Sequence, residues 1–445
     1  MPASKASILF ENATVLPCTG TDAVVSPGFV AVGGETILAV GAGDPSQELR
    51  AEAAEIIDCG GDIVMPGMVN THGHLPMSLF RGLGDDEPDR LRRYIFPLEA
   101  KLVSPEMVRV GTRLAAAELI AGGVTCAADM YYFEPDIADA LAPTGLRAVL
   151  GETIVDFKAP DGQGPDAGFK LTEDLIAATV GNPLLTATIA PHAPYTTGEN
   201  ILRRCAAFAE NHDIGVQSHL SEMPYETTWV SEKYGTTPTG LYDRCGLLNE
   251  RLIAAHCLTV SESDIALLGE RSVGVAINSG ANAKAGKGIA PALDLITAGA
   301  RVGLGSDGPM SGNTIDLFAQ MDMIAKMQKM RANDRTVMPA WQAVTLATSG
   351  GADALGLGDR IGRLAPGYQA DIIRIDTRAP RFHPRHDPYA ALVYAARPGD
   401  VRDSMVAGRW LMRDRDLLTL DLAGVTDDAT RLANLMRAAI DLPAI

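Results

Sequence analysis

Residues 62–74 read Asp-Ile-Val-Met-Pro-Gly-Met-Val-Asn-Thr-His-Gly-His, and this stretch indicates the fold more strongly than any other. Its apolar run ends at His72 and His74, which stand one residue apart. Side chains at positions i and i+2 of an extended backbone lie on the same side, so both imidazoles can reach one ion. The stretch therefore predicts a strand whose C-terminal end carries half of a metal site.

Three further segments follow the same pattern, because each is a short apolar run that ends in a side chain suited to metal binding or proton transfer. They are residues 215–222 with His219 and Glu222, residues 252–256 with His256, and residues 301–308 with Asp307. Stretches with helical periodicity separate them, including 105–121, 199–211, 261–268 and 314–331. We therefore predict an α/β fold, a (β/α)8 TIM barrel, in which the C-terminal strand ends surround one mouth.

The residue types define the chemistry that this mouth would support. His72, His74, His219 and Asp307 offer three nitrogens and one carboxylate, a set that suits Zn²⁺ or Fe²⁺ and leaves a position for water. Such an ion lowers the pKa of its bound water toward neutrality and so generates a nucleophile. The sequence predicts metal-assisted hydrolysis.

These motifs resemble the amidohydrolase superfamily. Residues 66–74, 219–222, 256–257 and 305–308 match its pattern in order and with similar spacing, over nearly the whole chain. They look like the branch of mononuclear-zinc aryl-amine deaminases and triazine hydrolases, and within it they are most similar to the methylthioadenosine/S-adenosylhomocysteine deaminases. The resemblance implies that water replaces an amino group on a heterocyclic substrate.

The same resemblance implies a role for each catalytic residue. Glu222 would carry a proton from water to a ring nitrogen, and His256 would polarise the attacked centre. Asp307 would pass a proton to the leaving ammonia, and His192 would touch the heterocycle. Binuclear relatives carry a carboxylated Lys at the end of the fourth barrel strand, but residues 185–195 contain no Lys. We therefore expect one Zn²⁺ per subunit, with Fe²⁺ as the alternative.

Substrate recognition rests on two further resemblances. The segment Tyr94–Glu99 is similar to one whose Glu accepts hydrogen bonds from both ribose hydroxyls in nucleoside deaminases, so Glu99 favours a nucleoside. Arg147 resembles an Arg that meets the amino-acid carboxylate of S-adenosylhomocysteine. The loop 156–165 has no second Arg for that carboxylate, and Lys158 is the candidate replacement. The turn 278–284 also departs from the family pattern Asn-Pro-x-Ser-Asn-x-Lys.

Three functions remain open at this level. The leading one is deamination of S-adenosylhomocysteine, methylthioadenosine or adenosine. The main alternative is a deaminase or chlorohydrolase of a free heterocycle such as a pterin, a guanine-like base or an s-triazine. A catalytically silent metal-binding scaffold is disfavoured, because pseudo-enzymes of this superfamily lose a ligand or the acid. All six residues are present here: His72, His74, His219, Glu222, His256 and Asp307.

The sequence pattern at both ends of the chain predicts short strands separated by glycines. The resemblance implies that residues 1–65 and 360–445 combine into a small discontinuous β-sandwich with a C-terminal tail, while residues 66–359 form the barrel. The turn at residues 367–371 is similar to the Pro-Gly-x-x-Ala-Asp element of that sandwich.

Composition excludes several classes of partner. The formal charge of −17 argues against nucleic acid and against an anionic membrane, since both need clustered Lys and Arg. No apolar run reaches transmembrane length, and the six Cys form no C-x-x-C pair. We expect a cytoplasmic enzyme with a small-molecule substrate, and the sequence leaves homo-oligomerisation open.

Overall fold

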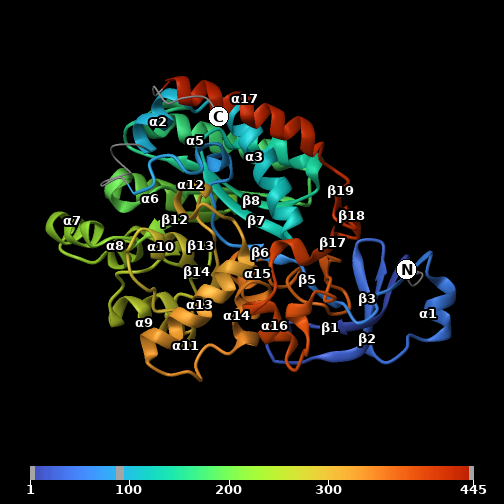
Figure 1. Cartoon of the computed structure of the whole chain (residues 1–445). Helices are drawn as coiled ribbons and strands as arrows, with labels where there is room; N and C mark the ends of the chain where they lie inside the picture. Colours follow the sequence, from blue (N-terminus) through green and yellow to red (C-terminus); the bar gives the residue numbers. More distant parts are fainter. Residues whose placement is uncertain (1–5, 87–94, 440–445) are drawn as a thin grey trace.

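Eight parallel strands form a nearly closed barrel in the part of the chain that the computed structural model describes, residues 6–86 and 95–439 (Figure 1). In chain order the strands are β6 (Met68–Asn70), β7 (Val124–Tyr131), β8 (Arg147–Ile154), β11 (Leu185–Pro191), β12 (Gly215–Leu220), β13 (Leu252–His256), β14 (Gly274–Ile277) and β15 (Arg301–Leu304). The first and last strands approach each other where Thr71 N donates to Leu304 O at 2.9 Å. The structure confirms the predicted fold class.

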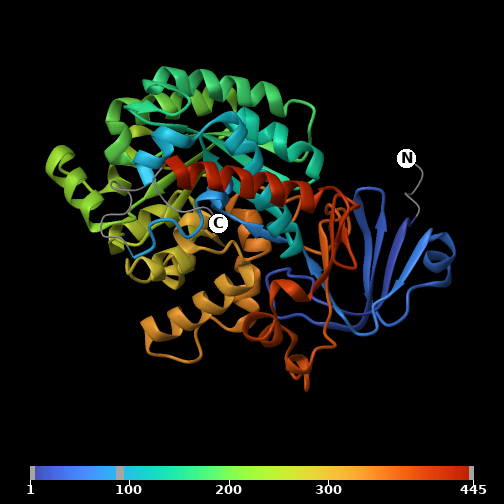
Figure 2. The same ribbon diagram turned by 45° about the horizontal axis from the view of Figure 1, so that its top comes forward.

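Helices surround the barrel strands (Figure 2). The longer ones are α3 (Pro105–Ala121), α5 (Gly164–Thr179), α6 (Pro194–His212), α7 (Pro224–Tyr234), α9 (Glu262–Glu270) and α13 (Leu317–Ala332). The shorter ones are α2 (Phe96–Leu102), α4 (Glu134–Leu141), α8 (Pro238–Cys245), α10 (Ser279–Lys284), α11 (Ala292–Ala298), α12 (Pro309–Gly312), α14 (Ala340–Leu346) and α15 (Ser349–Ala354). Helix α3 has the predicted bounds, because Ser104 caps Met107 N, Pro105 takes the first helical position and Gly122 follows the end.

A second sheet joins the two ends of the chain. Its nine strands run in the order β19-β18-β17-β16-β5-β1-β2-β3, with β4 paired to β1, within the described residues. They are β1 (Ile8–Val15), β2 (Val25–Gly33), β3 (Thr36–Ala42), β4 (Glu55–Asp58), β5 (Ile63–Pro66), β16 (Ile372–Ile375), β17 (Val401–Val406), β18 (Arg409–Arg413) and β19 (Asp416–Leu417). Most pairs are antiparallel, and β16 joins the two halves by pairing with β5. The sheet packs around a separate apolar core that includes Phe10, Val30 and Ile372.

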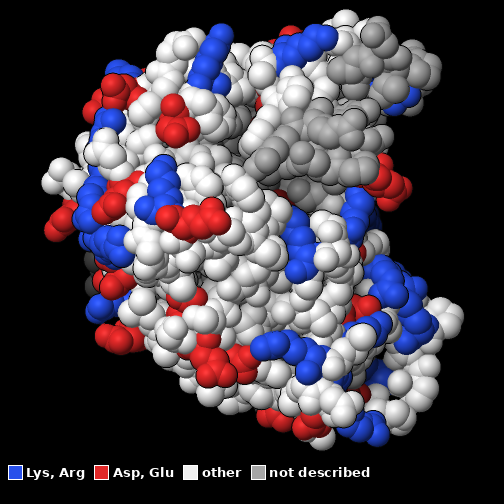
Figure 3. All heavy atoms as spheres, turned by 90° about the vertical axis from the view of Figure 1, so that its left-hand side faces the viewer, with Lys and Arg blue, Asp and Glu red and all other residues white. Residues whose placement is uncertain are grey.

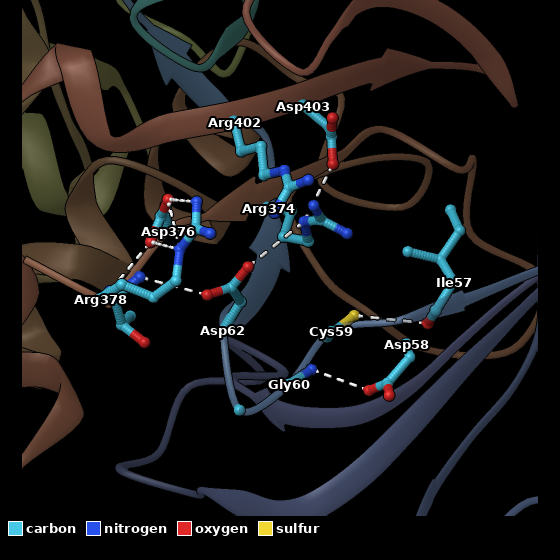
Figure 4. Close-up of polar contacts among 12 residues, drawn as sticks. Ile57, Asp58, Cys59, Gly60, Asp62, Arg374, Asp376, Arg378, Arg402 and Asp403 are labelled. Atoms are coloured by element: carbon cyan, nitrogen blue, oxygen red, sulfur yellow. Dashed lines mark hydrogen bonds and ion pairs between the residues drawn. The ribbon is translucent and has the colours of Figure 1, made fainter.

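Buried charges also connect the two ends of the chain. Arg374 Nε lies 2.9 Å from Asp403 Oδ2 and 3.5 Å from Asp62 Oδ2 (Figure 4). The other oxygens of these carboxylates accept backbone hydrogen bonds, from Thr377 N to Asp62 at 3.2 Å and from Asp414 N to Asp403 at 2.8 Å. We call Asp62, Arg374 and Asp403 the sheet cluster, in which both carboxylates form ion pairs with Arg374 and each accepts a backbone hydrogen bond.

The C-terminal segment does more than extend the second sheet. Helix α17 (Leu422–Ala439) packs along α3 on the barrel, as both ribbon views show (Figures 1 and 2). Arg431 pairs with Glu106 of α3 at 2.7 Å.

The domain boundaries at 65/66 and 359/360 stay a prediction. The second sheet uses residues as far as Pro66 before the barrel begins at Met68.

On the face shown in Figure 3, basic and acidic side chains are interspersed. None of the helices in the described residues is both long and apolar enough to cross a membrane. All six cysteines are buried free thiols.

Candidate metal and catalytic site

Five predicted site residues meet at the C-terminal ends of the barrel strands. His72 and His74 follow β6, His219 lies near the end of β12, His256 ends β13 and Asp307 follows β15. Ligand atoms of His72, His74 and His219 lie within 4.8 Å of one another, and so do those of His72, His256 and Asp307. The parallel barrel produces this convergence, since every strand delivers its C-terminal end to the same mouth.

The surrounding backbone orients two of the imidazoles. His74 Nδ1 donates to Met130 O at 2.6 Å, and His219 Nδ1 donates to His192 O at 2.9 Å. In each neutral ring the Nε2 atom is therefore an acceptor, and these two Nε2 atoms face each other at 3.3 Å. Two facing lone pairs need a cation between them, and backbone carbonyls commonly orient metal-binding histidines in this way.

His72 and Asp307 complete the set. His72 Nε2 is buried without a hydrogen-bond partner, and Asp307 Oδ1 lies 3.9 Å from it and 3.4 Å from His74 Nε2. An orphaned buried nitrogen is costly unless a ligand satisfies it. Three nitrogens and one carboxylate converging in this way fit a divalent cation such as zinc.

Protonation states agree with metal binding. Burial lowers the pKa of His72, His74 and His219, so the imidazoles stay neutral. Burial would raise the pKa of Asp307, but the neighbouring His256 and His74 hold it below its usual value. Neutral imidazoles and an ionised carboxylate are the forms that bind a cation.

An interstrand contact brings the two halves of the site together. Asn70 Nδ2 donates to Ser306 Oγ at 2.8 Å, and Ser306 N donates back to Asn70 Oδ1 at 2.9 Å. A Cβ at Gly305 would stand 2.2 Å from Asn278 Oδ1 and 3.0 Å from His72 Cβ, so only glycine fits this close approach. These buried contacts place Asp307 beside the two histidines that follow β6.

Two of the site residues have a strained backbone. His256 has φ of 77° and Asp307 has φ of 59°, in the left-handed region that costs a non-glycine residue free energy. Such strain persists only where the surrounding structure holds it, and it clusters at functional sites.

Glu222 lies beside His256 at the edge of the metal-competent group. Its Oε1 is 3.7 Å from His256 Nε2, and it also forms an ion pair with Lys287. Burial alone would raise the pKa of Glu222, but His256 and Lys287 lower it below its usual value. The opposite ring nitrogen, His256 Nδ1, lies 3.0 Å from the amide oxygen of Asn282.

Aromatic rings form the side of the mouth next to His192. The Phe96 ring centroid lies 6.4 Å from that of His192 and 6.1 Å from that of Phe157. The ring centroid of Tyr195 lies 6.2 Å from that of His192. These faces suit the stacking of a flat heterocycle.

Glu99 of α2 lies within reach of the mouth. It is buried beside the Tyr131 hydroxyl, and the Tyr131 ring is 6.2 Å from that of His74. Burial raises the pKa of Glu99 to about 8, although Tyr131 partly offsets this effect. Tyr94, which was part of the same predicted segment, lies outside the described residues.

The structure does not bring Arg147 to the mouth, so its predicted role in substrate binding is wrong. Arg147 is the first residue of β8, whereas the site lies at the opposite ends of the strands. Its guanidinium is buried and pairs with Asp371 through Nε at 3.0 Å and Nη2 at 3.1 Å. Lys158 is exposed on the two-residue strand β9 (Lys158–Ala159), next to Phe157, and its role stays a prediction.

Sequence reasoning missed the residues that hold the site together. Asn70, Asn282, Glu226 and Lys287 contact predicted site residues or the backbone beside them. Asn70 fell inside the stretch 62–74 and Asn282 inside the turn 278–284, but neither of them was assigned a role from the sequence. The contacts of Asn70 and Lys287 join segments whose proximity follows from the closed barrel, so local spacing carries no signal for them. Glu226 is only four residues from Glu222, but no motif marked it.

Comparison with known proteins agrees with the site. The model of the amidohydrolase family matches residues 63–411. The chain belongs to the amidohydrolase family. A 5-methylthioadenosine/S-adenosylhomocysteine deaminase of Syntrophobacter fumaroxidans is 42% identical over 441 residues, which cover 98% of this chain and all of the relative. The family and this relative make the chain a hydrolase acting on C–N bonds.

Solved structures extend the comparison. The crystal structure of an adenosine deaminase from Xanthomonas campestris with bound zinc superposes with a TM-score of 0.94 at 35% identity. The superposition covers 98% of this chain and all of the adenosine deaminase chain. Atrazine chlorohydrolase from Arthrobacter aurescens, complexed with zinc, has a TM-score of 0.88 at 21% identity, over 96% of this chain and all of that one. That second likeness concerns the fold alone.

Proposed function

We propose that this amidohydrolase is a divalent-metal-dependent deaminase of adenosine-type nucleosides, with methylthioadenosine and S-adenosylhomocysteine as its substrates. The proposal rests on one observation above the others. Glu222 and His256 face each other 3.7 Å apart at the rim of a buried, converging set of His and Asp ligands. The names of the relative from Syntrophobacter fumaroxidans and of the adenosine deaminase from Xanthomonas campestris support the substrate class.

In this proposal His72, His74, His219 and Asp307 hold one Zn²⁺ per subunit. The bound ion would lower the pKa of a water molecule and make it a nucleophile at neutral pH. The residues 185–191 of β11 contain no Lys that could bridge to a second ion, which supports a single metal.

The remaining residues move protons and bind the substrate. Glu222 carries a proton to the ring nitrogen, so that the carbon bearing the amine becomes electrophilic. His256 polarises the attacked centre, and Asp307 transfers a proton to the departing ammonia. His192 and the neighbouring rings stack on the base, and Glu99 accepts hydrogen bonds from the ribose hydroxyls. The free cysteine thiols are compatible with action in the reducing cytoplasm.

Ammonia release from zinc-loaded protein tests the reaction. Glu222→Gln keeps the size of the side chain but cannot shuttle a proton, so we expect a loss of about 10² or more in kcat with unchanged metal content. Steady-state kinetics and elemental analysis of both proteins provide the measurement. Turnover of the variant near that of the wild-type enzyme, with its metal verified, would remove Glu222 from the reaction.

A panel of substrates tests the nucleoside assignment. If Glu99 binds both ribose hydroxyls, a free base leaves a desolvated carboxyl unpaired, at about 1–3 kcal/mol per lost hydrogen bond. We expect methylthioadenosine to be preferred over adenine by at least about tenfold in kcat/KM, and Glu99→Ala to erase most of this preference. Comparable rates for adenine, a pterin or a triazine would contradict the nucleoside assignment and leave the hydrolytic chemistry intact.

A further inference from the structure

Lys287 forms an ion pair with Glu222 at the mouth of the barrel. Both side chains are largely buried, with 21% of Lys287 and 13% of Glu222 exposed. The ammonium approaches Oε1, the same oxygen that lies 3.7 Å from His256 Nε2. Lys287 therefore contacts the carboxyl group to which the proposed function assigns proton transfer.

The loop after α10 is shaped to present this lysine. Lys287 stands between Gly286 and Gly288, whose φ angles are 64° and 112°. Only glycine adopts such angles readily, so the chain turns sharply on each side of Lys287. Lys287 N also donates to Asn282 O at 2.9 Å, which ties the loop to the end of α10.

These contacts form a closed set around Glu222. The amide oxygen of Asn282 lies 3.0 Å from His256 Nδ1, and the other nitrogen of that ring, Nε2, faces Glu222. Glu222 in turn accepts a hydrogen bond from Lys287. The backbone of Lys287 then completes the set at Asn282. Each member is held by two neighbours, so the arrangement defines the direction of the Glu222 carboxyl group.

A separate group holds the backbone of Glu222. The buried Glu226 carboxyl accepts Ser221 N at 2.7 Å with one oxygen and Glu222 N at 3.0 Å with the other. Ser221 has φ of 52°, so this clamp stabilises a turn that is otherwise unfavourable. The clamp leaves the side-chain torsions of Glu222 free, and in the described residues Lys287 is the cation that fixes them by direct contact.

We propose that Lys287 is a positioning residue for the proton-transfer step, holding Oε1 of Glu222 so that Oε2 points to the reacting atoms. This inference rests on the proposed function. The ammonium donates a hydrogen bond and keeps its own proton, while Glu222 moves the proton of the reaction. A charge-assisted hydrogen bond of this kind restricts a rotatable carboxylate more strongly than a neutral contact would.

Kinetics of Lys287→Met test the proposal, since methionine keeps an unbranched side chain as far as Cε and removes the charged amine. We expect kcat for the best nucleoside to fall about 10- to 100-fold, because small errors in catalytic geometry have effects of this size. KM should stay within about twofold, and the metal content should be unchanged. Lys326→Met is the matched control: it removes a Lys of helix α13 that pairs with Asp322 at 2.6 Å on the surface, and it should leave kcat unchanged.

A double variant separates positioning through Glu222 from a general structural role. In the Glu222→Gln background, Lys287→Met should cause no further loss beyond about twofold, because the group it positions has lost its function. Aminoethylation of Lys287→Cys, which restores an ammonium, should recover most of the activity, and the six buried native thiols leave the new one as the accessible target. Losses that multiply in the double variant, or a kcat of Lys287→Met near that of the wild type, would overturn the proposal.

A crystal structure of zinc-loaded Lys287→Met provides a readout that does not depend on turnover. We expect the Glu222 carboxyl to leave its position or to occupy several rotamers, while the backbone of Ser221 and Glu222 stays in place. An unchanged, well-ordered Glu222 would overturn the inference even if no substrate had been found. Absence of ammonia release by the wild-type enzyme would instead contradict the proposed function.

Discussion

The barrel mouth and the sheet cluster both bury charged side chains, but they arrange their polar atoms in opposite ways. In the sheet cluster Arg374 lies against Asp62 and Asp403, and backbone N–H groups occupy the outer carboxylate oxygens (Figure 4). At the mouth the acceptor nitrogens of His74 and His219 face each other instead. The sheet cluster pairs opposite charges within the protein, whereas the mouth brings together acceptors that need a cation.

This difference separates structural from functional charge. Buried charges that are paired contribute little net stability, but removing one partner leaves an uncompensated charge that is costly. Converging lone pairs such as the buried His72 Nε2 are costly until a ligand arrives. We therefore expect substitutions at the mouth to change metal binding and turnover, and substitutions in ion pairs beneath the barrel to change stability.

The largest expected effect is that of His72→Ala. The variant should lose the bound divalent ion, from about one per chain to near zero, and ammonia release should fall to background because the activated water is lost. Elemental analysis and kinetics measure both. The exposed His386→Ala is the control and should behave as the wild type. A His72→Ala protein with full metal content would refute the assignment of His72 as a ligand.

Arg147→Met should have the next largest effect. It should lower the stability of the protein and leave its substrate specificity unchanged. It leaves Asp371 buried and unpaired, so the free energy of unfolding should fall by about 3–5 kcal/mol in urea titrations of the metal-loaded enzyme. The double variant Arg147→Met/Asp371→Asn should recover part of this loss. The ratio of kcat/KM for S-adenosylhomocysteine to that for methylthioadenosine should not change. A selective loss of S-adenosylhomocysteine turnover would return Arg147 to the substrate site.

The smallest effect, counted per pH unit, concerns Glu226. Burial raises the pKa of Glu226 from 4.5 to about 8, so between these values the folded protein holds a proton that the unfolded chain has released. Stability from this group is therefore complete below about pH 4.5 and is lost as pH rises toward 8, with a slope of about 1.4 kcal/mol per pH unit. Glu226→Gln should remove this part of the slope. Parallel stability curves for the two proteins, from urea titrations at several pH values, would contradict the expectation.

The fold and the metal-competent set were predictable because the relevant signals are local. An apolar run that ends in His72 and His74 specifies both a strand and the side on which its polar side chains lie. Repetition of that pattern at His219, His256 and Asp307 then implies a barrel mouth, since parallel strands end at the same edge. The structure brings all five residues to that mouth.

Arg147 was misplaced because its position within the strand was not visible in the motif. The sequence shows an Arg near an apolar run, but β8 begins at Arg147 and does not end there. A residue at the start of a barrel strand lies on the face opposite the mouth. The partner that explains its burial, Asp371, is 224 residues away in the chain.

The sequence by itself determined the architecture and the residue types at the mouth, because strand periodicity and strand-end chemistry are encoded over a few residues. Tertiary structure decided which polar groups hold those residues in place. Asn70 with Ser306 and Lys287 with the Glu222 carboxyl are examples. The Asn70 and Lys287 contacts span 236 and 65 residues, and they exist only once the barrel brings its strand ends to one mouth.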